Sequence, residues 1–94
     1  MSSIVINDTL SLPAEQVLFI GNYSILYTHE NKLYVKCYGL IYNYAMVLFI
    51  DNEMYMKLRY NKTEIYMRVS KHRENRIQEF ITEWEKPTCS ASLF

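Results

Sequence analysis

The stretch that decides the fold runs from residue 54 to residue 69 and reads MYMKLRYNKTEIYMRV. Met and aliphatic side chains alternate with Tyr and charged ones on both sides of Asn61-Lys62, which is the pattern of two β-strands joined by a two-residue turn. Such a turn places Tyr60 opposite Thr63, and this register fixes every other pair along the hairpin. The predicted pairs are Leu58 with Ile65, Met56 with Met67, Met54 with Val69, Arg59 with Glu64, Lys57 with Tyr66, and Tyr55 with Arg68.

This register gives the hairpin two unlike faces. One face is aliphatic and rich in Met, which suits a core. The other alternates Tyr with Lys and Arg, and it contains one ion pair and two contacts between a cation and an aromatic ring. Tyr tolerates half-exposure because its ring is apolar while its hydroxyl can stay wet. We therefore expect the Met face to point inward.

Further strands precede this hairpin. Runs rich in Tyr, Ile, Leu and Val predict strands at 23–28, 33–40 and 44–50, with a sixth at 17–20 if that segment also pairs. Residues 29–32 suit a four-residue hairpin loop and residues 51–53 a turn. Gly39, inside a strand run, predicts a bulge.

The same alternation predicts the faces of these strands. The first hairpin has one mainly aliphatic face, formed by Leu26, Thr28, Leu33, Val35 and Cys37, and one Tyr-rich face, formed by Tyr23, Ile25, Tyr27, Tyr34, Lys36 and Tyr38. If Ile50 faces Met54 across the next turn, the aliphatic face gains Met46, Leu48 and Ile50, and the Tyr face gains Val47 and Phe49.

A C-terminal helix follows the strands. Apolar side chains recur at the i, i+3, i+4, i+7 spacing of one helix face, namely Ile77, Phe80, Ile81 and Trp84. Ser70 is the expected cap and Pro87 the expected stop. A Trp84 side chain buried on the sheet would make Trp84→Ala cost about 3–5 kcal/mol.

Together these elements predict an α+β fold. The expected architecture is an antiparallel five- to six-stranded meander sheet, or a partly closed barrel, with one C-terminal amphipathic helix packed on one face. Residues 1–86 form the predicted single domain, and residues 87–94 a flexible C-terminal tail. Because one helix covers one face, the Tyr-rich face must be solvated, covered by the N-terminal segment, or docked on a partner.

Composition and sequence features favour a cytoplasmic protein. The longest apolar run, 45–50, is too short to span a membrane, and the N-terminus lacks the basic and apolar regions of a signal peptide. Cys37 and Cys89 are far apart and match neither a zinc site nor a redox pair. A residue usage typical of AT-rich genomes points to a virus, a phage or an AT-rich microbe as the source. For a viral protein the expected location is the host cytoplasm.

No catalytic motif is present in the sequence. There is no phosphate-binding Gly-rich loop, nucleophile elbow or metal-binding helix, so we expect no cofactor, no metal and no small-molecule substrate. A compact enzyme that uses His29 or His72 is the most distant alternative.

The predicted function is that of a small non-enzymatic interaction or regulatory protein, which binds a protein partner or itself as a homodimer. Tyr, Met and Arg are enriched in interfaces, so the candidate contacts lie on the Tyr-rich face. They are Tyr34, Lys36, Tyr38, Tyr55, Lys57, Arg59, Tyr66 and Arg68.

Nucleic-acid binding by the same face is the alternative. Residues 54–76 contain seven basic and two acidic side chains, although the whole chain is neutral. A basic strip beside aromatic rings is typical of single-strand binding. The added phosphate contacts are Lys62, Lys71, Arg73 and Arg76.

Overall fold

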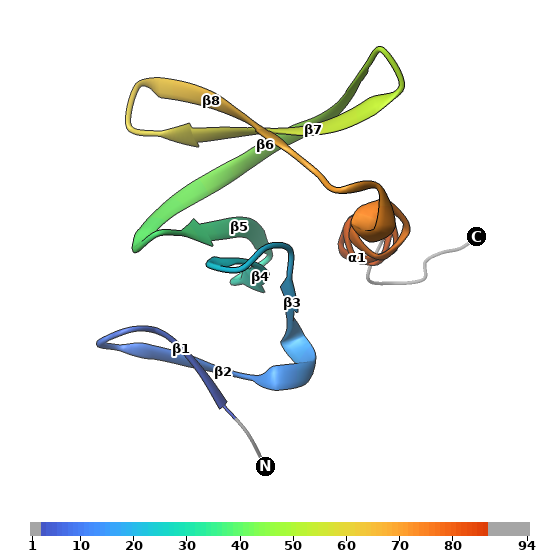
Figure 1. Cartoon of the computed structure of the whole chain (residues 1–94). Coiled ribbons are helices and arrows are strands. Elements are labelled where there is room, and N and C mark those ends of the chain that lie inside the picture. The colour runs from blue at the N-terminus through green and yellow to red at the C-terminus, as the bar shows by residue number, and fades with distance from the viewer. Residues whose placement is uncertain (1–2, 87–94) are drawn as a thin grey trace, which may run out of the picture.

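The computed structural model describes residues 3–86, and Figure 1 shows how their elements are arranged. Within this range, eight strands precede a single α-helix. The strands are β1 (Ser3–Asn7), β2 (Leu10–Pro13), β3 (Val17–Phe19), β4 (Ser24–His29), β5 (Lys32–Cys37), β6 (Leu40–Ile50), β7 (Glu53–Tyr60) and β8 (Thr63–Arg68); the helices are the 3-10 turns η1 (Ala14–Gln16) and η2 (Lys71–Arg73) and the α-helix α1 (Glu74–Glu85).

The α+β fold is confirmed. Strands β3 to β8 form one six-stranded antiparallel meander in chain order, and β1 pairs with β2 in a separate hairpin. The larger sheet does not close into a barrel, so β3 and β8 are its two edges. The predicted tail at 87–94, with Pro87 and Cys89, lies outside the described residues.

The register of the β7–β8 hairpin is as predicted. Tyr60 pairs with Thr63 and Tyr55 with Arg68, and the predicted pairs between them are all present. Beyond the strand, the Val69 amide donates to the Met54 carbonyl at 2.9 Å, which continues the same ladder. The two-residue turn therefore specifies the pairing of the whole hairpin.

The other hairpin turns are shorter than the sequence indicates. His29 pairs with Lys32, so the loop between β4 and β5 holds only Glu30 and Asn31, both with positive φ. Tyr38 and Gly39 form an equally short turn between β5 and β6, with φ values of 49° and 82°. Gly39 is thus a turn residue and not a bulge, and the predicted strand at 33–40 ends at Cys37.

The predicted faces of β6 are wrong. Asp51 and Asn52 alone make the next turn, so Ile50 pairs with Glu53 and not with Met54. A shift of one residue moves every side chain of a strand to the other face of the sheet. Val47 and Phe49 therefore lie on the Met-rich face, whereas Met46, Leu48 and Ile50 lie on the Tyr-rich face.

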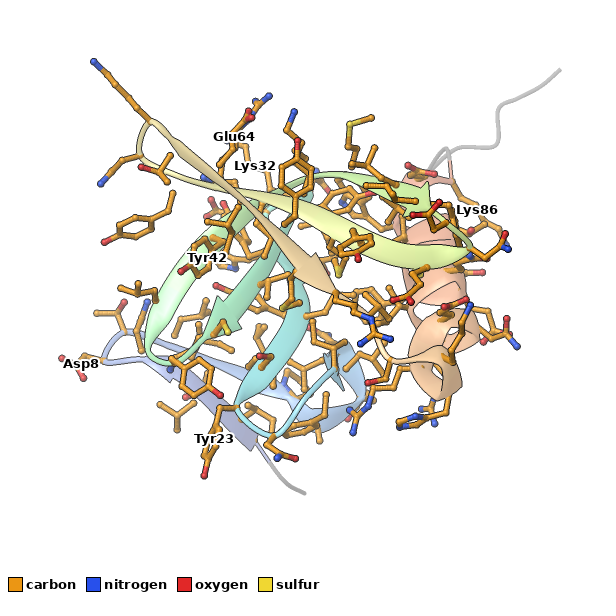
Figure 2. All side chains as sticks on the ribbon, turned by 45° about the horizontal axis from the view of Figure 1, so that its top comes forward. Asp8, Tyr23, Lys32, Tyr42, Glu64 and Lys86 are labelled. Atoms are coloured by element: carbon orange, nitrogen blue, oxygen red, sulfur yellow. The ribbon has the colours of Figure 1, made fainter. Side chains whose placement is uncertain are left out.

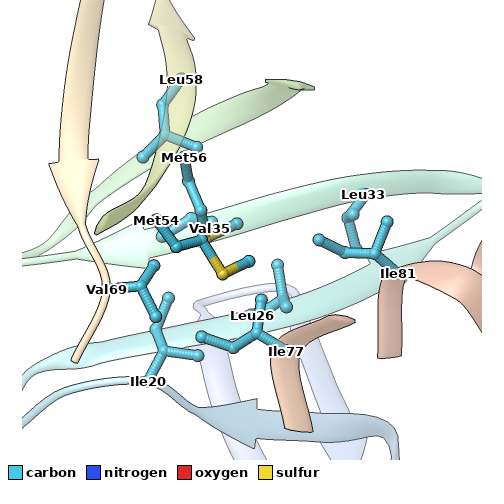
Figure 3. Packing of buried hydrophobic residues seen from close by; sticks show 10 residues of the cluster. All are labelled: Ile20, Leu26, Leu33, Val35, Met54, Met56, Leu58, Val69, Ile77 and Ile81. Carbon is cyan, nitrogen blue, oxygen red and sulfur yellow. The ribbon is translucent and has the colours of Figure 1, made fainter. Parts of the chain in front are cut away.

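The main core lies between the Met-rich face and α1. Ile77 and Ile81 of the helix point toward Leu26, Leu33 and Met54, as Figure 3 shows. Met54, Met56 and Leu58 are fully buried, and these alternate positions of β7 explain why the strand can face both core and solvent. Phe80 and Trp84 are only partly buried at the rim of this core.

The start of the helix also differs from the prediction. Ser70 precedes the 3-10 turn η2 and not α1, and its side chain makes no capping hydrogen bond. Trp84 contacts the ring of Tyr44 edge to face at 5.9 Å, and its Nε1 donates to the Asn31 carbonyl at 3.1 Å. These contacts fasten the end of the helix to β6 and to the β4–β5 turn.

A second, smaller core lies on the opposite side of β4 and β5. The β1–β2 hairpin covers this side, as the lower part of Figure 1 shows, and it buries Ile6 and Leu12 against Ile25 and Tyr27. No strand is predicted from the sequence for these N-terminal residues. On β4 and β5 the Tyr-rich face is therefore covered by the N-terminal segment, and it is neither solvated nor left free for a partner there.

These burial differences predict the order of two helix substitutions. Ile77→Ala should lower the free energy of unfolding by about 2–5 kcal/mol, because Ile77 is fully enclosed. Trp84→Ala should cost less than the roughly 3–5 kcal/mol of a buried aromatic side chain, because Trp84 keeps part of its surface in water. Urea unfolding measures both, with the exposed Thr82→Ala as control. A larger loss for Trp84→Ala would contradict this arrangement.

The turn between β4 and β5 generates a second stability prediction. Glu30 has a φ of 54°, a left-handed conformation in which a Cβ atom is strained. Glu30→Gly should raise the free energy of unfolding by about 0.5–1 kcal/mol, since relief of that strain exceeds the entropy cost of glycine. Glu30→Ala keeps the Cβ and is the matched control; an equal gain for it would assign the effect to the carboxylate instead.

Candidate functional site

The candidate site is the surface of β6, β7 and β8 that points away from α1, which we call the outer face. The register places its side chains in rows that cross the three strands. These rows are Ile50 and Glu53; Leu48, Tyr55 and Arg68; Met46, Lys57 and Tyr66; and Asn43, Arg59 and Glu64.

Apolar and aromatic side chains on this face are open to solvent. Met46 is 44% exposed, Ile50 50% and Tyr66 53%. Leu48 and Tyr55 are half-buried between them. The face therefore presents an apolar strip that nothing in residues 3–86 covers.

The charged side chains of the outer face are paired with one another. Glu64 accepts a hydrogen bond from Arg59 Nε at 2.8 Å, and its other oxygen lies 3.3 Å from Lys57 Nζ. Arg68 pairs with Glu53 across the neighbouring strand. The sequence predicts tyrosine rings as the partners of Lys57 and Arg68, whereas both cations contact carboxylates. Figure 2 shows Glu64 on the outer side of the hairpin.

The pKa of Glu64 reports this pairing. The Arg59 hydrogen bond, followed by that of Lys57, holds the pKa of the Glu64 carboxyl below its ordinary value of 4.5. Both donors favour the charged carboxylate. Glu64 is therefore an anion throughout the neutral pH range, and it offsets much of the positive charge beside it.

The structure brings five of the eight candidate contacts together and separates the other three. Tyr55, Lys57, Arg59, Tyr66 and Arg68 all lie on the outer face. Tyr34 and Lys36 point to the same side of the sheet, but they lie on β5, where the β1–β2 hairpin covers them.

Specific contacts hold these separated residues. Lys36 Nζ donates to the carbonyl of Ile6 in β1. The rings of Tyr34 and Tyr27 stack with centroids 5.4 Å apart, and burial, followed by the charge of Tyr34, raises the pKa of Tyr27 to about 12. Tyr38 is exposed at the β5–β6 turn and packs on Tyr23 at 5.3 Å.

The four added phosphate contacts do not form one strip. Lys62 lies in the turn between β7 and β8, whereas Lys71 and Arg73 lie in η2, beyond the other end of β8. A six-residue strand separates these two places by about 20 Å. Lys71 donates to the Asn52 carbonyl, and Arg73 donates to that of Phe19 at 3.0 Å. Arg76 is exposed on α1.

The sequence pattern does not place several residues on the outer face where the structure has them. Met46, Leu48 and Ile50 are assigned to the inner face, and Glu53 is read as part of a turn. Counting Asp51-Asn52 as a two-residue turn, by analogy with Asn61-Lys62, would have placed all four residues correctly.

The two histidines of the distant enzyme alternative lie in separate places, and each contacts a neighbour in the sequence. His29 lies 3.7 Å from Glu30, and His72 accepts a hydrogen bond from Arg73 at 3.3 Å. Within residues 3–86, no three His, Cys, Asp or Glu side chains gather as metal ligands. Among the same residues, no helix has the length and apolar character to traverse a bilayer.

Comparisons with known proteins add no relative: no protein-family model matches the chain, and no curated protein or solved structure matches it significantly.

The ion pairs of the outer face predict a pH dependence. Folding lowers the pKa of Glu64, so its ion pairs stabilise the folded chain at a pH above the unfolded pKa. This stabilisation is lost as the pH falls through the folded pKa. Arg59→Gln should raise the pKa of Glu64 toward 4.5 more than Lys57→Gln does. Carbon-detected NMR titration of the carboxyl groups measures this shift. Arg68→Gln, which removes the partner of Glu53, should leave the Glu64 pKa unchanged. A Glu64 pKa at its ordinary value in the natural sequence would contradict the pairing with Arg59 and Lys57.

Proposed function

We propose that this chain is a small non-enzymatic interaction protein that binds a protein partner through the outer face. The observation that supports this function is an exposed apolar strip whose neighbouring charges are already paired. Aromatic, Met and Arg side chains of this kind are enriched at the centres of protein interfaces.

The pairing of charges favours a protein partner over a nucleic acid. A phosphate backbone needs free cations, because affinity comes from the counterions that Lys and Arg displace. The outer face holds three basic and two acidic side chains, and each basic one lies within ion-pair distance of an acidic one. Burial against a protein surface instead favours charges that already have a partner, since an unpaired charge is costly to desolvate.

The area of the outer face indicates that a partner also reaches its rim. Three strands about 4.8 Å apart and about eight residues long present roughly 400 Å². A standard interface covers about 800 Å² on each partner. The partner must therefore extend beyond the outer face, and the free edge at β8 adjoins it directly.

Two substitutions on β6 test the proposed function. Met46→Ser combined with Ile50→Ser removes apolar contact area from residues that are already about half exposed, so the melting temperature should change little. Binding should weaken by about 2 kcal/mol or more, roughly 30-fold, because central apolar anchors are lost. The immobilised chain is tested for binding of proteins from a nuclease-treated extract of the source cells.

The matched control removes apolar side chains of similar exposure elsewhere. Val5→Ser with Phe19→Ser lies off the outer face and should bind as the natural sequence does. An equal loss of binding in both double variants would overturn the assignment of the outer face as the binding surface. Retention of material only without nuclease, with a steep dependence on salt, would assign the face to nucleic acid instead.

A further inference from the structure

The outer face ends at an unpaired strand edge. β8 is the last strand of the six-stranded sheet, and its ladder with β7 has no bulge and no proline. Edge strands of soluble proteins are usually blunted by such features, because their free amide and carbonyl groups can pair with another chain. Within residues 3–86, β8 pairs only with β7.

The hydrogen-bond pattern shows which residues of β8 offer free backbone groups. In an antiparallel ladder, alternate residues bond to the neighbouring strand. The pairs Tyr60–Thr63 and Met54–Val69 are bonded, because the first closes a two-residue turn and the Val69 amide donates to Met54. Ile65 and Met67 therefore bond inward to β7, and the residues that point their backbone groups outward are Glu64, Tyr66 and Arg68.

The order of these three residues is self-complementary. If a second copy of β8 lies antiparallel with its Tyr66 opposite this Tyr66, each Glu64 faces the Arg68 of the other copy. Ile65 faces Met67 on the inner side in the same register. Each outward residue exchanges two bonds with its opposite number, so the pairing forms six backbone hydrogen bonds.

Other registers of the same edge lack this match. A slip that places Glu64 opposite Tyr66 brings Lys62 opposite Arg68, and like charges directly opposite are destabilising. A slip in the other direction places Arg68 opposite Tyr66 and leaves Glu64 beyond the strand, opposite Ser70. Parallel pairing in register places each charge opposite its own copy.

We propose that two copies of this chain pair antiparallel through β8 about a two-fold axis at Tyr66, which joins their six-stranded sheets into one. This inference goes beyond the proposed function: the second copy pairs with the β8 edge and leaves the outer face itself open to another protein partner. The two outer faces become continuous across the axis, with a Tyr66 pair at the centre and a Glu64–Arg68 ion pair on each side. Such an isologous interface is the commonest kind in protein oligomers.

Charge reversal tests the pairing and its register together. Glu64→Arg should weaken dimerisation at least tenfold, because it sets two cations opposite each other, and Arg68→Glu should do so with two anions. The two single variants mixed in equal amounts should dimerise with each other, because every opposed pair is again of opposite charge. The double variant E64R/R68E should also recover self-association. Sedimentation velocity at micromolar concentrations and low salt, where charge screening is weak, measures all four samples.

The control is a charge reversal on a residue that lies off both the outer face and β8. Arg76→Glu changes an exposed cation of α1, on the other side of the sheet, so its dimerisation should resemble that of the natural sequence. Thermal melts show that each variant is folded. Dimers that persist in both single variants, or a mixture that stays monomeric, would overturn the β8 register. A natural chain that stays monomeric would overturn the second copy as partner, and the β6 substitutions would still decide independently whether the outer face binds other proteins.

Discussion

The structure depends on the fact that a single helix can cover only one face of a six-stranded sheet. Ile77 and Ile81 close the main core from the Met-rich side, and the 12 residues of α1 are about 18 Å long. A sheet has a second face, which must be covered or remain in water. The β1–β2 hairpin covers β4 and β5, and no other described residue covers β6, β7 and β8. The exposed outer face is thus a direct consequence of the number and position of the covering elements.

The turns determine which side chains occupy that face, and they also determine how far the sequence can predict it. Asn61-Lys62 is a recognisable two-residue turn, and the β7–β8 register follows from it without error. Glu30-Asn31 and Tyr38-Gly39 are equally short, but Glu and Tyr are unusual at positive φ, so their turns resemble a longer loop and a continuing strand. The turn at Asp51-Asn52 is one residue shorter than the pattern predicts, and this difference places the side chains of β6 on the opposite face of the sheet.

The sequence does not predict the N-terminal hairpin, because its strands are short and its turn lacks glycine and proline. Ile4 and Ile6 alternate with exposed residues, as do Leu10 and Leu12. Between them Asn7 accepts a hydrogen bond from the Thr9 amide at 2.9 Å, a local bond that favours a turn. This hairpin divides the predicted Tyr-rich site: Tyr34 packs against the second core and Lys36 bonds to β1, whereas Tyr55 and Tyr66 remain on the outer face. Periodicity gives the direction of each side chain, but not what packs on it.

The charge balance of the sequence likewise says little about charge in space. The seven basic residues of the segment 54–76 are spread over the outer face, the β7–β8 turn, η2 and α1, and three of them form ion pairs with Glu53 or Glu64. These ion pairs lie at the surface, where each contributes little to the stability of the fold. Glu64 and Arg68 can therefore exchange partners at little cost in stability. When docking excludes water, the same charges interact more strongly because the local dielectric constant falls. Weak pairing in the free chain thus leaves the edge of the outer face able to reorganise against a surface of complementary charge.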